Sequence, residues 1–196
     1  MVTLLAALSF AQPMESPEPT QFRLSLRGVA EQWSDTSISS TYAQGAPIGA
    51  IGIAVPLSDR LWIDVEVGYR RLTTETDETL AFNLIPASVV AEWSFGSGRA
   101  RPFLAAGPTL TAFHEQHSPN ADGLSATSGA RIAGELRFGG RVNTGLITPP
   151  RAPAPSVVQS ASVELYVARR QARPFGGKNG FDLGAWRAAL GISFAL

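Results

Sequence analysis

Hydrophobic and polar residues alternate with a period of two along most of this chain. The clearest stretch is residues 61–70, LWIDVEVGYR, in which every second side chain is apolar. No stretch keeps a period of 3.6 over three helical turns, so the pattern predicts strands. The expected strands are residues 21–32, 47–56, 61–70, 80–95, 101–114, 129–142, 157–170 and 182–196.

Eight long strands in succession predict an all-β fold, an eight-stranded antiparallel up-and-down transmembrane β-barrel. Strands of about 10 to 14 residues are roughly twice the usual length in soluble proteins, and they match a tilted strand that spans a membrane. Closure of the barrel also removes the free edges that long apolar strands would otherwise expose.

The polar faces of these strands carry many charges, nearly all of them arginine or carboxylate. The interior of an eight-stranded barrel is only just wide enough for side chains, and buried charges need partners. Six basic and six acidic residues therefore predict an ion-paired interior with a structural role. These expected interior charges are Arg23, Arg27, Glu31, Asp64, Glu66, Arg70, Glu92, Arg131, Glu135, Arg137, Glu164 and Arg187.

The last ten residues, RAALGISFAL, place Leu190, Ile192, Phe194 and Leu196 on one face and small residues on the other. This is typical of a closing strand that faces lipid on one side and a crowded interior on the other. We expect these four residues to form the insertion signal of the barrel. Aromatic residues near strand ends further suggest interfacial girdles: Phe22, Trp33, Tyr69, Trp93, Phe95, Phe113 and Trp186.

Composition narrows the function classes. The formal net charge is +0, with 16 basic and 16 acidic residues, which argues against nucleic acid as a partner. The chain has no cysteine, which excludes disulfides, thiolate catalysis and lipid attachment at a cysteine. After the N-terminus it has no apolar run of about 18 residues that would form a spanning helix. We expect no cofactor and no metal.

The first residues are predicted to form a cleavable signal peptide and a disordered lead-in, and not a part of the barrel. Residues 1–11 have an apolar run that ends in small residues, as in a signal peptide. Residues 12–20 contain three prolines and two glutamates, which favour a disordered lead-in to a barrel domain at 21–196.

The predicted connections differ in length from one side of the barrel to the other. Short turns at 56–60 and 96–99 suit the periplasmic side, and the polar segments suit the outside: 34–45, 73–79, 115–128 and 171–181. The proline-rich segment 143–156 is long for the periplasmic side, and its role has no physical explanation in the sequence.

Residues 83–110, NLIPASVVAEWSFGSGRARPFLAAGPTL, resemble bacterial outer-membrane β-barrel domains of the OmpA/OmpX-like kind. The resemblance implies insertion into the bacterial outer membrane by the outer-membrane barrel assembly machinery, with outer-membrane lipid around the barrel. Members of this group usually end in Phe or Trp, whereas this chain ends in Leu196. The expected role is non-catalytic: structural, or surface interaction through extracellular loops whose partner is unknown.

Two other functions remain open. The first is a barrel hydrolase that modifies lipid A, with His114 or His117 and Ser118 joined by Glu115 or Glu135. The spacing of these residues does not match the His-x-Ser pair of barrel deacylases, and the two histidines make an incomplete metal site. The second is a soluble lipocalin-like barrel that binds a small apolar ligand and carries its Leu, Phe and Trp inside.

Overall fold

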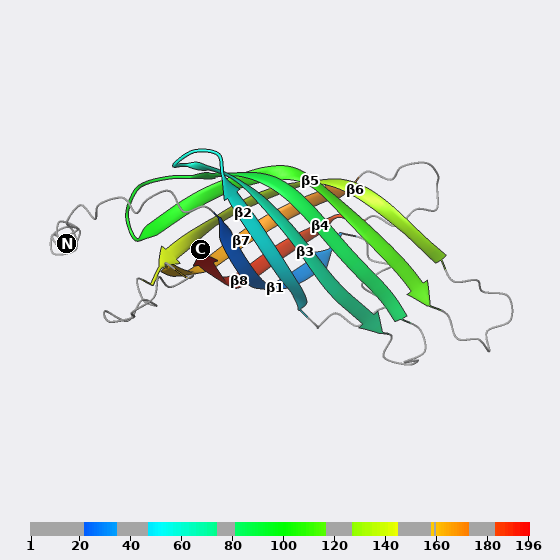
Figure 1. Cartoon of the computed structure of the whole chain (residues 1–196). Coiled ribbons are helices and arrows are strands. Elements are labelled where there is room, and N and C mark those ends of the chain that lie inside the picture. Colours follow the sequence, from blue (N-terminus) through cyan, green and yellow to red (C-terminus); the bar gives the residue numbers. More distant parts are fainter. Residues whose placement is uncertain are drawn as a thin grey trace, which may run out of the picture.

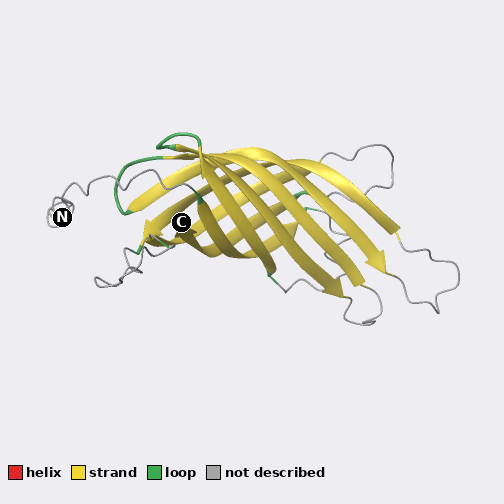
Figure 2. Ribbon diagram, viewed as in Figure 1, coloured by secondary structure: helices red, strands yellow, loops and turns green. Residues whose placement is uncertain are grey.

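The computed structural model describes residues 22–34, 47–73, 81–116, 127–144, 158, 160–172 and 183–196. These residues form a closed antiparallel β-barrel in which every strand pairs with its neighbours in sequence (Figures 1 and 2). The strands are β1 (Arg23–Trp33), β2 (Ile48–Pro56), β3 (Leu61–Thr73), β4 (Ala81–Ser94), β5 (Ala100–Gln116), β6 (Thr127–Asn143), β7 (Ser160–Ala172) and β8 (Ala185–Ala195). The predicted fold class is confirmed.

The barrel closes where β8 returns to β1. The pairing runs without a break from Arg23 opposite Ala195 to Trp33 opposite Ala185. Beyond it, the backbone N–H of Leu196 donates to the carbonyl of Phe22. The strands lie close to the predicted ranges, although β5 and β6 each reach 17 residues and are longer than expected.

The two ends of the barrel differ in their connections. At the end where β1 begins and β8 finishes, here called the terminal end, short turns join β2 to β3 and β4 to β5. In the first turn, Leu57 and Ser58 donate backbone hydrogen bonds to the carbonyl of Leu61. In the second, Gly96 has a φ of 80°, a conformation that favours glycine. The opposite end is here called the distal end.

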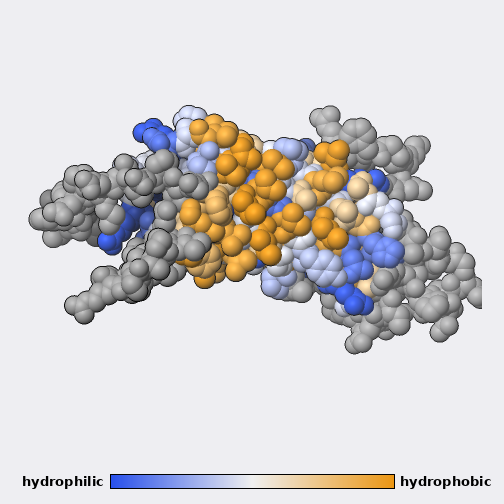
Figure 3. All heavy atoms as spheres, in the orientation of Figure 1, coloured by the Kyte–Doolittle hydropathy of each residue, from blue (hydrophilic) through white to orange (hydrophobic). Residues whose placement is uncertain are grey.

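The outer surface of the barrel is apolar. Ile51, Leu165 and Leu190 are 57%, 58% and 60% exposed, and similar residues on every strand point outward. Figure 3 shows hydrophobic residues gathered over the middle of the visible face, with hydrophilic residues toward its ends. In the described part of the chain, no helix has the length and apolar character needed to cross a membrane.

The interior contains an apolar cluster near the distal end, which corrects the predicted aromatic girdle. Trp33 and Phe113, expected outside, are buried. The rings of Phe82 and Phe113 pack in a tilted arrangement, with centroids 5.7 Å apart. The distal apolar cluster consists of Trp33, Leu72, Phe82, Leu84, Phe113, Ala133, Ala172, Leu183 and Ala185. Trp33 and Phe113 share the alternation phase of their buried neighbours, and this phase directs both side chains inward.

The other five aromatic residues of the predicted girdles lie on the outer surface. They are Phe22, Tyr69, Trp93, Phe95 and Trp186. Residues 1–21, with the predicted signal peptide and lead-in, lie outside the described residues, as do most of the predicted outer segments and most of the proline-rich segment.

Candidate functional site: the charged barrel interior

The structure buries most of the charged residues singled out in the sequence, all on the inner face of the wall. Arg131 differs, because it is partly exposed and its guanidinium lies over the Phe113 ring, 5.8 Å from the centroid. The buried ones are Arg23, Arg27, Glu31, Asp64, Glu66, Arg70, Glu92, Glu135, Arg137, Glu164 and Arg187.

Two further arginines belong to this interior and were missing from the expected set. Arg141 on β6 and Arg170 on β7 are both buried. Arg141 has the same alternation phase as Arg137, and Arg170 has the same phase as Glu164. Strict extension of the period-two pattern to the strand ends identifies both residues.

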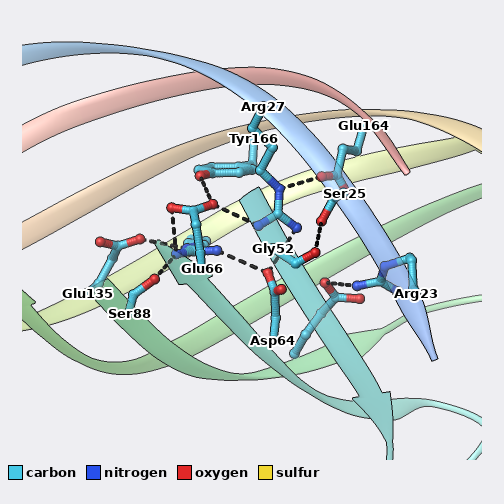
Figure 4. Close-up of polar contacts among 12 residues, drawn as sticks. Arg23, Ser25, Arg27, Gly52, Asp64, Glu66, Ser88, Glu135, Glu164 and Tyr166 are labelled. Carbon is cyan, nitrogen blue, oxygen red and sulfur yellow. Dashed lines mark hydrogen bonds and ion pairs between the residues drawn. The ribbon is translucent and has the colours of Figure 1, made fainter. Parts of the chain in front are cut away.

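Glu66 lies at the centre of the network. Its Oε2 accepts a hydrogen bond from Arg27 Nη1 at 2.7 Å and another from the Tyr166 hydroxyl at 3.0 Å (Figure 4). Its Oε1 lies 3.3 Å from Arg137 Nη2 and 3.1 Å from Arg187 Nη2. One carboxylate on β3 therefore holds side chains from β1, β6, β7 and β8.

Toward the terminal end, Glu92 and Glu164 share arginine partners. Arg141 Nη2 lies 3.1 Å from Glu92 Oε2 and 3.3 Å from Glu164 Oε2. Glu92 also accepts from Arg23 Nη2 at 3.0 Å, while Glu164 pairs with Arg27 Nε. The guanidinium of Arg23 covers the Trp62 ring at 4.8 Å, a favourable cation–π arrangement.

Toward the distal end, Glu135 and Glu31 are the anionic partners. Glu135 Oε1 accepts from Arg137 Nε at 2.6 Å, and Glu135 Oε2 accepts from Arg187 Nη1 at 2.8 Å. Glu31 Oε1 lies 2.9 Å from Arg187 Nε and 3.3 Å from Arg170 Nη1. The ion pairs therefore continue from one end of the charged interior to the other.

The residues of the hydrolase hypothesis do not come together in the described structure. His114 lies on the outer side of β5, where its Nδ1 is 2.6 Å from Ser128 Oγ on β6. Glu135 lies on the inner side of the wall with its arginine partners, so it cannot join His114. His117 and Ser118 lie outside the described residues. Within the described ranges no group of three metal-ligating side chains occurs.

The expected insertion residues lie on the outer face of β8 and just beyond it. Leu190 and Ile192 are exposed, and Phe194 and Leu196 are partly exposed. Three of them line a shallow apolar groove at the junction of β1, β7 and β8, together with Leu26, Val163 and Gly191. The closing strand therefore presents a continuous apolar surface.

Comparison with solved structures places this fold among known barrels. The N-terminal β-barrel domain of Pseudomonas aeruginosa OprF is 14% identical, with a TM-score of 0.51, over 88% of this chain and 96% of that chain. Neisserial surface protein A is 12% identical, with a TM-score of 0.55, over 89% and 96%. OprG from Pseudomonas aeruginosa is 7% identical, with a TM-score of 0.54, over 90% and 96%.

These likenesses define the fold. The chain has the fold of the eight-stranded bacterial outer-membrane barrels of the OmpA/OmpX-like kind. No protein-family model and no curated protein sequence matches it.

Proposed function

We propose that this protein is an integral β-barrel of the bacterial outer membrane, with no catalytic activity, whose barrel serves as a rigid scaffold. The observation that carries this proposal is the reversed polarity of the wall, with Leu, Ile and Val outside and Arg, Glu and Asp inside. A contiguous apolar belt of this extent is rare on soluble monomers, and lipid is the environment that covers it.

Burial of the interior charges supports a closed scaffold without an open pore. Arg137 and Glu164 are each 1% exposed, whereas a water-filled passage would leave the charges that line it hydrated. The interior side chains also pair with one another across the barrel, so a solute would have to break ion pairs to pass.

The alternative of a soluble lipocalin-like barrel requires the opposite arrangement. Such a barrel keeps an apolar interior for its ligand and a polar surface for water. Here the side chains of the distal apolar cluster pack against one another. The rest of the interior combines the charged network with a second buried apolar cluster that includes Val29, Phe103 and Tyr166.

Within this proposal, outer-membrane lipid surrounds the belt, and the barrel assembly machinery inserts the chain by way of β8. Contacts with other molecules are assigned to the distal connections, residues 35–46, 74–80, 117–126 and 173–182. These connections lie outside the described residues, and their partner is unidentified.

The proposal is tested by refolding residues 12–196 into detergent and running heated and unheated samples on a denaturing gel. A closed, detergent-resistant barrel migrates differently before and after boiling. A monomer that stays soluble without detergent and shows no shift would contradict the proposal. Planar-bilayer recording of the same sample should show no stepwise conductance.

A further inference from the structure

Arg70 differs from the other buried arginines of the interior. The residue is only 3% exposed, and its Nε and Nη1 have no hydrogen-bond partner. In the described part of the chain, no carboxylate lies within ion-pair distance of it. Arg170 also lacks hydrogen-bond partners, but it is held by ion pairs, which Arg70 is not. Each of the other buried arginines forms at least one ion pair: Arg23, Arg27, Arg137, Arg141, Arg170 and Arg187.

The surroundings of Arg70 are apolar. It pairs across the sheet with Leu84 on β4, and the next inward residue on its own strand is Leu72. Both leucines belong to the distal apolar cluster. On the other side, the Ile48 side chain packs against Gly68, the preceding inward position. None of these neighbouring side chains can accept a hydrogen bond from a guanidinium.

The charge balance leaves Arg70 unmatched. Among the described residues, seven arginines and six carboxylates are buried in the interior. Glu31, the buried carboxylate near the distal end, is already held by Arg187 at 2.9 Å and Arg170 at 3.3 Å. An arginine cannot release its proton to escape burial, so the positive charge of Arg70 needs an acceptor of opposite sign.

We propose that the barrel interior binds one small inorganic anion, of the chloride or phosphate class, at Arg70 beneath the distal apolar cluster. The unfilled Nε and Nη1 donors supply hydrogen bonds to it, and the unmatched charge supplies the electrostatic attraction. The apolar side chains around the site favour a small anion over an extended one. This inference concerns the barrel interior alone, so it does not rest on the proposal that the barrel lies in the outer membrane.

The test compares wild-type protein with Arg70→Met and with the matched control Arg71→Met, the neighbouring arginine that points outward and is exposed. Each is refolded in detergent in sodium gluconate and titrated with sodium chloride or sodium phosphate at constant ionic strength. The temperature at which the heat-modified band appears is the readout. Ligand binding to the folded state raises this temperature along a saturation curve.

For wild type and Arg71→Met, we expect a saturable rise with at least one of the two anions. Arg70→Met should not respond, and in gluconate it should unfold at or above the wild-type temperature because its unpaired charge has been removed. An unresponsive wild type, an equal rise in Arg70→Met, or a lower unfolding temperature for Arg70→Met in gluconate would overturn the proposal.

A second measurement does not depend on a variant. Crystals of the wild-type barrel grown in sodium bromide, the analogue of chloride, or in sodium arsenate, the analogue of phosphate, should show an anomalous peak beside the Arg70 guanidinium with at least one of the two anions. Peaks confined to the outer surface with both anions would contradict an interior anion.

Discussion

The hydroxyl of Tyr166 on β7 donates a hydrogen bond of 3.0 Å to Glu66 Oε2 on β3. These two strands are four positions apart in the closed order of eight, so the bond joins opposite walls of the barrel. The guanidinium groups of Arg137 and Arg27 also lie over the Tyr166 ring, with their Cζ atoms 5.0 Å and 5.8 Å from its centroid. Side-chain contacts therefore join opposite walls of the barrel, in addition to the backbone pairing between neighbouring strands.

Replacement of Tyr166 by Phe should lower the free energy of unfolding by about 1.5–3 kcal/mol, because a buried carboxylate loses a hydrogen bond. Tyr69→Phe is the matched control, since its hydroxyl donates to Asn83 at the exposed outer surface. Denaturant unfolding of both variants in detergent is the measurement. Equal losses in the two variants would contradict a special role for the bond across the barrel.

Replacement of Arg137 by Ala should cost about 3–5 kcal/mol, because buried carboxylates are left with too few cations. Arg137 contacts Asp64 at 3.2 Å, Glu66 at 3.3 Å and Glu135 at 2.6 Å. Glu66→Ala should cost a similar amount, since it removes the carboxylate that three arginines share. Unfolding in detergent measures both. Arg60→Ala, in an exposed turn, should change the stability little, and unchanged melting of Arg137→Ala would show that the network is dispensable.

A methyl group at Gly107 should destabilise the barrel by about 1–3 kcal/mol, as overpacking does. A Cβ at this position on β5 would overlap the backbone of Val89 and Val90 on β4, which cannot move aside as a side chain can. Gly134→Ala on β6 is the control, because a Cβ there meets nothing within 4 Å. If the two variants unfold at the same denaturant concentration, the close approach of β4 and β5 is not required for stability.

An arginine in place of Leu190 or Ile192 should reduce the stability in lipid vesicles by about 2–4 kcal/mol, because a charge then faces the hydrocarbon. Leu57→Arg is the matched control: its side chain is 61% exposed, but it lies in the turn at the terminal end. Folding into vesicles followed by denaturant titration is the measurement. Wild-type stability of Leu190→Arg would mean that β8 does not face lipid.

The alternation of residues was sufficient to predict the strands and the direction of most side chains, because successive residues of a strand point to opposite faces. The expectation and the structure differ where another cue competes with phase. Position near a strand end places Trp33 and Phe113 outside, although their phase directs them inward. The phase of Arg141 and Arg170 also directs them inward, although the expected set of interior charges does not include them.

The choice of partners inside the barrel could not be predicted from the sequence. Arg27 and Glu164 form an ion pair although they are 137 positions apart, and Arg23 pairs with Glu92 across 69 positions. Such contacts depend on the register of every strand between them, which the hydrophobic pattern fixes only as odd or even. The distal apolar cluster and the unmatched Arg70 depend on the same register.

The reversed polarity of the wall is tested most directly through its tryptophans. Trp93 and Trp186 are 48% and 55% exposed on the outer face, whereas Trp33 is 7% exposed in the interior. Three variants would each keep one of these tryptophans and have the other three tryptophans of the chain, Trp62 included, replaced by Phe. They would be folded into vesicles of lipid with brominated acyl chains. Bromine should quench the fluorescence of Trp93 and Trp186 strongly and that of Trp33 weakly. Strong quenching of Trp33 together with unquenched Trp93 and Trp186 would contradict the proposed membrane barrel.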